Sequence, residues 1–490
     1  MSQSVKKQRN WPFIIGVLFI CVGMQFANYG SAICVSGDLT KLGATQFYVL
    51  ISSLGTMGMM LVLPVLGKLT AILGQRTTIL MGVCIQLIGR IIMMIAPGWP
   101  VYALGQLIQS IGGGFYISAA YVLMPLAVER PELPKFFGYI AVANALGSMC
   151  GPLIVSMVYA MGSIYSKLAL ILNLPLVAIG LLLVMKDCPN KKNKDAAKGY
   201  DFAGLLLTVF GIACLVFCLN LSGKMFAWGS VPCLILAASA AVCIFIMIRR
   251  ELSIANPAVP LKMFRNERLT YAFICAAVAS AYSTCSASYC AMWIRTNFQG
   301  LPASTFFTGT GTLAQGLVTF VLGLFLGGYV GQKFAVRFRP FGIMSMVTAM
   351  IATGLLYCLK FTGTAAGGDL VLLANGTVPA GMLLIYLATA IGGFTSSVAQ
   401  GLYSAYWQSN MPREDIATGS ALYNFGNTGG SVIFSAVVGV VLGSSGDFTR
   451  AFATGFVFAC IGLLVALKGF RFTAEEIEAA ERQYQEKKTA

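Results

Sequence analysis

The feature that most constrains this chain is the repetition of uninterrupted apolar segments along its whole length. Runs of roughly 18 or more apolar residues recur from end to end, and one such run spans roughly 30 Å of hydrocarbon as a helix. Of 490 residues, 57% are hydrophobic and only 10% are charged, whereas a soluble domain carries roughly 25% charged residues. The sequence therefore predicts an all-α polytopic membrane protein.

The hydropathy pattern predicts about fourteen transmembrane helices. Their expected ranges are 12–35, 46–66, 78–97, 101–127, 136–160, 165–185, 202–221, 229–248, 269–293, 304–327, 341–359, 379–408, 416–443 and 449–468. The first run follows a basic flank like that of a signal peptide. It lacks a small-residue cleavage site, so we interpret it as a retained helix.

The basic residues indicate the orientation of these helices. With a cytoplasmic N-terminus, the predicted inner segments hold 26 Lys and Arg residues and the outer segments hold 6, and Arg90 lies inside the third span. The positive-inside rule then predicts that both termini are cytoplasmic. The net charge of +16 is explained by contact with anionic lipid heads. A nucleic-acid partner is not needed, and a bacterial cytoplasmic membrane is the expected location.

The acidic and metal-binding residues exclude several kinds of chemistry. The chain has no histidine, and its 17 Asp and Glu residues fall in predicted loops, helix ends or the tail. Most of the 14 cysteines lie in apolar runs, where they behave as small hydrophobes. We therefore expect no metal site, no cofactor and no enzymatic activity. No Gly-x-x-x-x-Gly-Lys-Ser/Thr stretch is present, which argues against ATP-driven transport.

A short polar turn occurs twice at equivalent places. Gly67, Gly74 and Arg76 follow the second predicted span, and Gly328 and Arg337 follow the tenth at an offset of 261 residues. Repeated six-helix halves with a site between them are a transporter architecture. We therefore predict an N-terminal bundle over 1–200, an inserted helix pair and linker over 201–268, a C-terminal bundle over 269–470 and a charged cytoplasmic tail over 471–490.

The turn also resembles a known motif. GKLTAILGQR (67–76) is similar to the loop motif of the major facilitator superfamily, matching it at Gly67, Leu69, Gly74 and Arg76. It departs at Ala71 and Ile72, where the family has an acid and an arginine.

Other stretches narrow the resemblance to the fourteen-span drug:proton antiporter family. In the fifth span, Gly138, Gly147, Gly151 and Pro152 match a motif typical of drug antiporters in this superfamily, although Val155 and Ser156 replace its final Gly-Gly. YDFAG (200–204), NPAVPLKMFRNERL (256–269) and GSALYNFGNTGGS (419–431) resemble the central region and thirteenth span of the fourteen-span family. The resemblance implies gating or conformational roles for these glycines, although glycines at helical spacing also serve as packing faces.

The usual coupling charges of that family are missing. The first span has no acid before Asp38, and Gln106 stands where the resemblance implies an arginine in the fourth span. We therefore do not carry over its coupling mechanism. Coupling could use an acid near a cavity mouth, Asp38 or Glu129, a sodium ion, or the charge of the substrate, and we favour the last.

Two arginines are candidate ligands for an anionic solute. Arg295 lies at the outer end of the ninth span beside Tyr289 and Trp293, which suits an amphipathic organic anion at a cavity mouth. Arg90 is the second candidate. Snorkelling of Arg90 and an ordinary aromatic belt around Arg295 are the alternatives.

Polar residues inside the spans complete the candidate binding site. They are Gln25, Asn28, Tyr29, Gln106, Tyr116, Asn144, Gln400, Tyr403, Asn424 and Asn427. A buried amide in hydrocarbon needs a partner, so each could instead bridge two helices.

These observations predict a secondary active transporter that moves small amphipathic organic solutes, including organic anions, by alternating access. A proton-coupled multidrug exporter and a transport-inactive receptor on the same fold are the alternatives. We expect a monomer, with coupling to protons or sodium left open.

Overall fold

The protein is built almost entirely of helices in the computed structural model. The described residues are 10–128, 133–188, 201–222, 225–254, 261–298, 304–332, 334–362, 370–373, 376–409, 416–442 and 447–470. Within them, 11 helical segments are long and apolar enough to cross a membrane. The prediction of a polytopic helical membrane protein is confirmed. The predicted tail over 471–490 lies outside the described residues.

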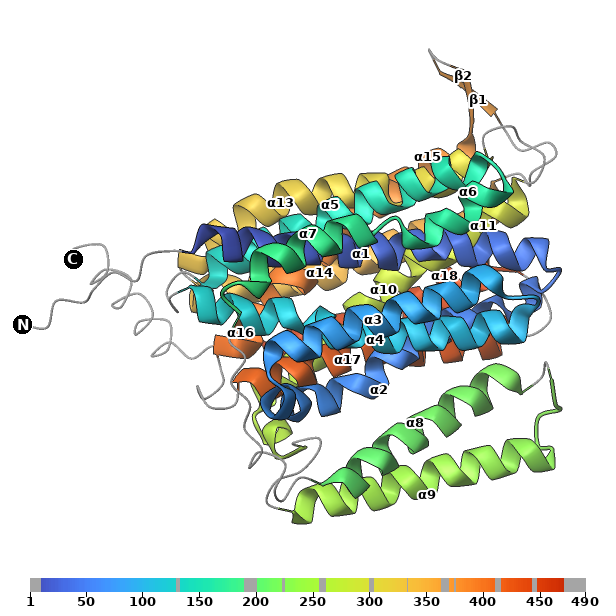
Figure 1. Ribbon diagram of the computed structural model, residues 1–490. Helices are drawn as coiled ribbons and strands as arrows, with labels where there is room; N and C mark the ends of the chain where they lie inside the picture. The colour runs from blue at the N-terminus through green and yellow to red at the C-terminus, as the bar shows by residue number, and fades with distance from the viewer. Residues whose placement is uncertain are drawn as a thin grey trace, which may run out of the picture.

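The first group of helices comes from the N-terminal part of the chain. It consists of α1 (Trp11–Lys41), α2 (Tyr48–Leu73), α3 (Gln75–Ile95), α4 (Trp99–Ala127), α5 (Leu133–Ala160), α6 (Ser163–Leu168) and α7 (Leu174–Met185). α1 packs against α5 and α7, and α3 packs against α4 (Figure 1). The side chain of Asn10 caps α1 by accepting a hydrogen bond from the amide of Phe13.

The second group comes from the C-terminal part. It consists of α10 (Glu267–Thr284), α11 (Cys290–Asn297), α12 (Ser304–Thr310), α13 (Leu313–Gln332), α14 (Phe334–Tyr357), α15 (Ala380–Ser397), α16 (Tyr403–Ser409), α17 (Ile416–Leu442) and α18 (Thr449–Gly469). α10 packs against α17 and α18, and α14 packs against α15 and α18. These two helix groups are called the N half and the C half below.

Two expected spans of the C half are each interrupted by a π-helical turn. The π-turn Cys285–Tyr289 joins α10 to α11, and the π-turn Val398–Leu402 joins α15 to α16. Such turns occur frequently at functional sites. Both belong to helices that we expected as single spans.

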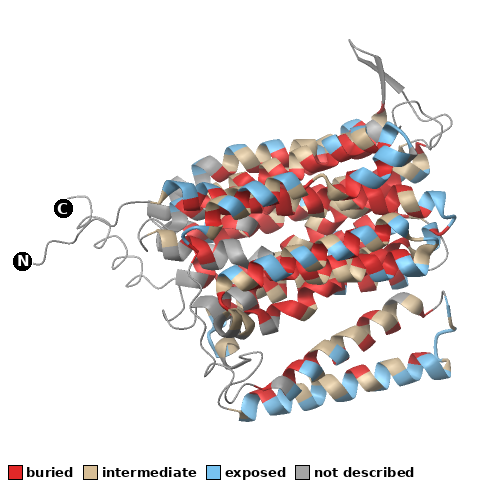
Figure 2. Ribbon diagram, in the orientation of Figure 1, coloured by how far each residue is buried: buried red, intermediate tan, exposed pale blue. Residues whose placement is uncertain are grey.

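The halves meet along two pairs of helices. α5 packs against α13, and α2 packs against α17. Small residues permit this approach: a Cβ on Gly316 would lie 2.7 Å from that of Met149, and one on Gly323 would lie 3.1 Å from Val142. Buried residues are concentrated on the inward-facing parts of the helices of this body (Figure 2).

A helical hairpin of α8 (Phe202–Leu221) and α9 (Val231–Ser253) lies beside this body (Figure 1). α8 contacts α2 and α17, whereas α9 exposes apolar side chains such as Val231 (Figure 2). An exposed apolar helix of this length is suited to contact with lipid. Asp201 caps α8 by accepting a hydrogen bond from the amide of Gly204, and it also accepts two hydrogen bonds of 2.8 Å from Arg250.

One feature departs from the expected all-α fold. Strands β1 (Leu370–Leu373) and β2 (Gly376–Pro379) form an antiparallel hairpin between α14 and α15, and it projects from the end of the bundle (Figure 1). Its LVLL stretch is an apolar run short enough to be a strand.

Candidate functional site

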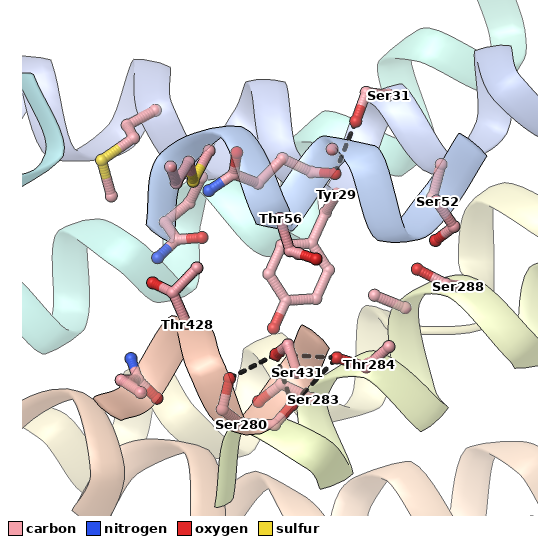
Figure 3. Close-up of a pocket in the computed structure, with 18 of the residues that line it drawn as sticks. Tyr29, Ser31, Ser52, Thr56, Ser280, Ser283, Thr284, Ser288, Thr428 and Ser431 are labelled. Carbon is pink, nitrogen blue, oxygen red and sulfur yellow. Dashed lines mark hydrogen bonds between the residues drawn. The ribbon is translucent and has the colours of Figure 1, made fainter. Parts of the chain in front are cut away.

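A cavity of about 200 Å³ lies between the two halves. The N half contributes side chains from α1, α2 and α4, and the C half contributes side chains from α10, its π-turn and α17 (Figure 3). A concave site between related bundles is where secondary transporters bind their solutes. The cavity is therefore the candidate substrate site.

The wall from the N half is rich in amide side chains. Its polar members are Gln25, Asn28, Tyr29, Ser31, Tyr48, Ser52, Thr56, Gln106 and Gln109. The amide nitrogen of Gln109 donates to the amide oxygen of Gln106 at 3.3 Å. Since a primary amide is both donor and acceptor, this wall can match many kinds of polar group on a solute.

The wall from the C half is rich in hydroxyl groups. Ser280, Ser283, Thr284 and Ser288 recur at helical spacing, so they share one face of α10 and its π-turn. The hydroxyl of Thr284 donates to that of Ser431 at 2.9 Å, and Ser280 also contacts Ser431. Figure 3 shows the phenol of Tyr29 pointing from the N half toward this hydroxyl cluster. Tyr423, Asn424, Asn427 and Thr428 complete the wall.

The cavity combines polar groups with apolar surface and no formal charge. None of the described residues that line it is an acid, a lysine or an arginine. Met24, Val35 and Met59 supply apolar contacts. An ionised solute would therefore meet only dipoles here.

Arg90 does not line this cavity. Its side chain is only 4% exposed and donates to the backbone carbonyl of Leu170 and to the side-chain oxygen of Asn173. The arginine therefore connects α3 to the segment before α7. This position differs both from the substrate ligand and from the snorkelling residue that the sequence suggested.

Arg295 also lies outside the cavity lining. Its guanidinium donates to the carbonyl of Ile33 at 3.4 Å and lies 5.5 Å from the ring centre of Tyr159. Its expected neighbours are core residues: Tyr289 packs edge-on against Phe434, and Trp293 packs edge-on against Phe298. These aromatic residues close the body of the protein at this end instead of forming a belt.

The remaining expected site residues are divided between the cavity and the core. Gln25, Asn28, Tyr29, Gln106, Asn424 and Asn427 are brought together around the cavity. Tyr403 instead donates to the carbonyl of Gly342 at 3.0 Å in the C half. Asn144 is buried, and neither atom of its amide has a hydrogen-bond partner. The side-chain surroundings of Gly67, Tyr116, Gly328, Arg337 and Gln400 lie outside the described part of the structure.

The described residues of the glycine motifs lie at a turn between helices or at close contacts between helices. Gly74 separates α2 from α3 at a φ of 85°, which favours glycine, and Arg76 is exposed beside it. Gly147 and Gly151 face the backbone of α1. Gly138 is buried, and Pro152 lies inside α5.

Sequence reasoning missed the hydroxyl groups of the cavity. Ser280, Ser283, Thr284 and Ser288 carried a usable signal, because polar residues at a spacing of three and four mark one helical face. Ser431 and Thr428 lie one turn apart on α17 and carried the same signal.

Two helical halves around a central polar cavity, with 11 candidate spans in the described residues, define a polytopic membrane transporter. A family model described as Major Facilitator Superfamily matches residues 15–435. The chain belongs to this superfamily, whose members are transporters and not enzymes. It is a multi-pass membrane protein, and its relatives agree with a location in the plasma membrane.

Its curated relatives are distant. Multidrug resistance protein 3 of Bacillus subtilis (strain 168) is 23% identical over 442 residues, which cover 89% of this chain and 81% of that protein. Multidrug transporter protein MdtP of the same organism is 25% identical over 281 residues, 55% of this chain and 50% of that protein.

Solved structures share the fold. The nucleoside transporter NupG has a TM-score of 0.57 at 14% identity, covering 94% of this chain and all of that chain. A bacterial homologue of the human drug peptide transporters PepT1 and PepT2 has a TM-score of 0.58 at 14% identity, covering 97% of this chain and all of that chain.

Proposed function

We propose that this chain is a secondary active transporter that carries small, uncharged amphipathic organic solutes by alternating access. The observation that supports this proposal is the cavity between the halves, where amides face hydroxyl groups and the described lining has no charge. Hydrogen-bonding groups of a solute would replace water on both walls, and apolar parts would contact Met24, Val35 and Met59.

The size of the cavity favours a small solute. Its volume of about 200 Å³ is below the ~300–1,000 Å³ that is usual for sites of drug-sized ligands. A compact solute with several hydrogen-bonding groups fits this space better than a large lipophilic drug.

The position of the arginines argues against the organic anion that the sequence suggested. Arg90 and Arg295 each have protein partners outside the cavity lining. A buried anion needs a paired charge, because an isolated ion in a low-dielectric site is strongly disfavoured. A neutral solute needs no such partner.

A proton-coupled multidrug exporter is the second candidate. It is supported by the names of the two Bacillus subtilis relatives, a multidrug resistance protein and a multidrug transporter protein. A cavity without charge is compatible with varied neutral drugs, so the two candidates differ in solute range and not in the location of the site.

For the membrane arrangement, we propose fourteen spans with both termini in the cytoplasm. The support is the 26-to-6 division of basic residues, together with helices at each of the expected ranges. We keep the division into 1–200, 201–268, 269–470 and 471–490, with α8 and α9 as the inserted pair.

Uptake into proteoliposomes tests the function. The probes are three analogues of one compact organic solute, one neutral, one anionic and one cationic, offered with pH and Na⁺ gradients imposed separately. We expect the neutral analogue to be carried best. Because Thr284→Val removes a cavity hydroxyl, it should raise the apparent KM roughly fivefold to tenfold, equivalent to about one hydrogen bond.

The matched control is Thr353→Val. Thr353 is buried in α14, and its hydroxyl donates to the carbonyl of Ala349 in the same helix. Removal of this hydroxyl should therefore leave KM unchanged. Preferred uptake of the anion would contradict the solute class. Absence of uptake of any analogue, together with binding, would favour the receptor alternative.

A further inference from the structure

Asp38 occupies a site that the substrate cavity does not use. It lies near the end of α1, where Tyr159 of α5 donates to one carboxylate oxygen at 2.8 Å and Tyr102 of α4 donates to the other at 3.1 Å. Gly37 allows this approach, because a Cβ there would lie 2.4 Å from the phenol oxygen of Tyr159. The carboxylate is thus held by two neutral donors of the N half.

Arg295, which belongs to α11 of the C half, also lies near Asp38. Arg295 lies over the ring of Tyr159 and reaches the carbonyl of Ile33 in α1. It interacts electrostatically with Asp38 across Tyr159, and its Nε is buried without a hydrogen-bond partner. Arg295 is therefore a C-half charge placed inside the N half.

The other ionisable groups around Asp38 belong to the N half. Lys41 and Cys34 lie on α1 itself, and Tyr102 and Tyr159 come from α4 and α5. Lys41 contacts the ring of Tyr159 at 4.2 Å. All of these would keep their places near Asp38 if the halves separated at this end, whereas Arg295 would leave.

We propose that Asp38 is a proton-binding site on the outer side, and that a proton and Arg295 compete for it. When the halves are closed at this end, as here, Arg295 adds its charge to that of Lys41 near the carboxylate. When they open, Arg295 withdraws with α11, and a proton from the outer solution binds a carboxylate oxygen and neutralises it. Acidification outside therefore favours the outward-open state, because a half-buried carboxylate that has lost Arg295 keeps, among the described residues, only Lys41 as a cationic neighbour, and a bound proton makes up for the lost charge.

This proposal rests on the proposed orientation, with this end outside, but not on any solute. It also differs from a purely structural role for Asp38. If the carboxylate only accepted hydrogen bonds that join the ends of α1, α4 and α5, the separation of the two halves would not depend on pH.

The experiment measures the distance between the halves at this end. Spin labels are attached through a keto amino acid at Thr40 of α1 and Thr296 of α11, which are both exposed, so that the native cysteines stay unlabelled. Distance distributions of the protein in nanodiscs are then recorded at about pH 8 and about pH 5, which bracket the titration of most protein carboxyls.

In the parent, acidification should raise the ratio of long to short distances roughly tenfold, within the usual range for coupled equilibria. Asp38→Asn should favour the long distance at both pH values, as should Arg295→Gln. Arg295→Lys keeps the charge and should restore the short distance at high pH. Arg450→Gln is the matched control, since Arg450 is an exposed arginine near the same end of the C half.

A parent distribution that is independent of pH would overturn the proposal. So would an Asp38→Asn protein whose distances still respond to pH as the parent does. Because no solute is present, a failure here leaves the proposed substrate class untouched. Conversely, a failed uptake assay leaves this proton site testable.

Discussion

The phenol of Tyr48, at the start of α2, donates a hydrogen bond of 2.8 Å to the backbone carbonyl of Ser288, which lies 240 residues further along the chain. The bond joins the N half to the π-turn of the C half. Tyr48 is almost fully buried, and its ring meets Phe448 edge-on at 6.3 Å. Tyr48 and Ser288 both line the cavity, and their bond, together with the bond from Arg295 to Ile33, joins the two halves at this end.

The first prediction concerns this bond. Tyr48→Phe keeps the ring but removes the donor, which should cost the closed state about 1 kcal/mol, or about a fivefold change in the open-to-closed ratio. The distance between labels at Thr40 and Thr296 measures this change. Tyr386→Phe is the control, because its hydroxyl bonds to Thr310 within the same half. Equal distances in parent and Tyr48→Phe would show that the bond does not stabilise closure.

The second prediction concerns the turn between α2 and α3. Gly74 has φ 85° and ψ 150°, a conformation that costs a residue with a side chain roughly 1–3 kcal/mol. Gly74→Ala, and more strongly Gly74→Val, should lower the melting temperature in detergent. Gly98→Ala should not, since Gly98 is extended and a Cβ there would make only an ordinary contact of 3.7 Å with Pro100. If both alanine variants melted like the parent, the turn would have no need for glycine.

Much of the fold followed from the sequence because it depends on hydrophobicity alone. Apolar length predicts a spanning helix without reference to its neighbours. The π-turn Cys285–Tyr289 and the strand pair at 370–379 depend on local packing and hydrogen bonding instead, so periodicity gave no sign of them.

The site was predicted less completely, for a physical reason that the arginines illustrate. Charge placed Arg90 and Arg295 among the candidates, but the direction of a side chain around its helix depends on the neighbouring helices. Arg90 turns toward Leu170 and Arg295 toward Ile33. Amides such as Gln25 and Asn28 were recognised, whereas serines were overlooked because a hydroxyl can bond within its own helix.

The third prediction concerns the glycines of α5. A Cβ on Gly151 would lie 2.6 Å from the carbonyl oxygen of Phe26, so α1 and α5 would have to move apart. Gly151→Ala should destabilise the protein by about 1–3 kcal/mol, as other overpacked contacts do, while protein that folds should keep the parent's solute range. Gly354→Ala is the control, because its nearest neighbour is the Phe456 ring at 3.4 Å. A stable Gly151→Ala protein with altered coupling would instead favour the antiport role that the motif suggests.

The last prediction tests whether Arg90 stabilises the protein through Leu170 and Asn173 or binds the solute, as the sequence suggested. Arg90→Met keeps the length of the side chain but leaves the carbonyl of Leu170 and the side-chain oxygen of Asn173 without this donor, so the free energy of unfolding should fall by about 1–3 kcal/mol. Thermal unfolding in detergent measures the loss, and Arg76→Met, at an exposed position, should show none. Because Arg90 lies outside the cavity, the KM for a neutral solute should stay at the parent value in protein that folds. Unchanged stability with a raised KM would instead place Arg90 on the path of the solute.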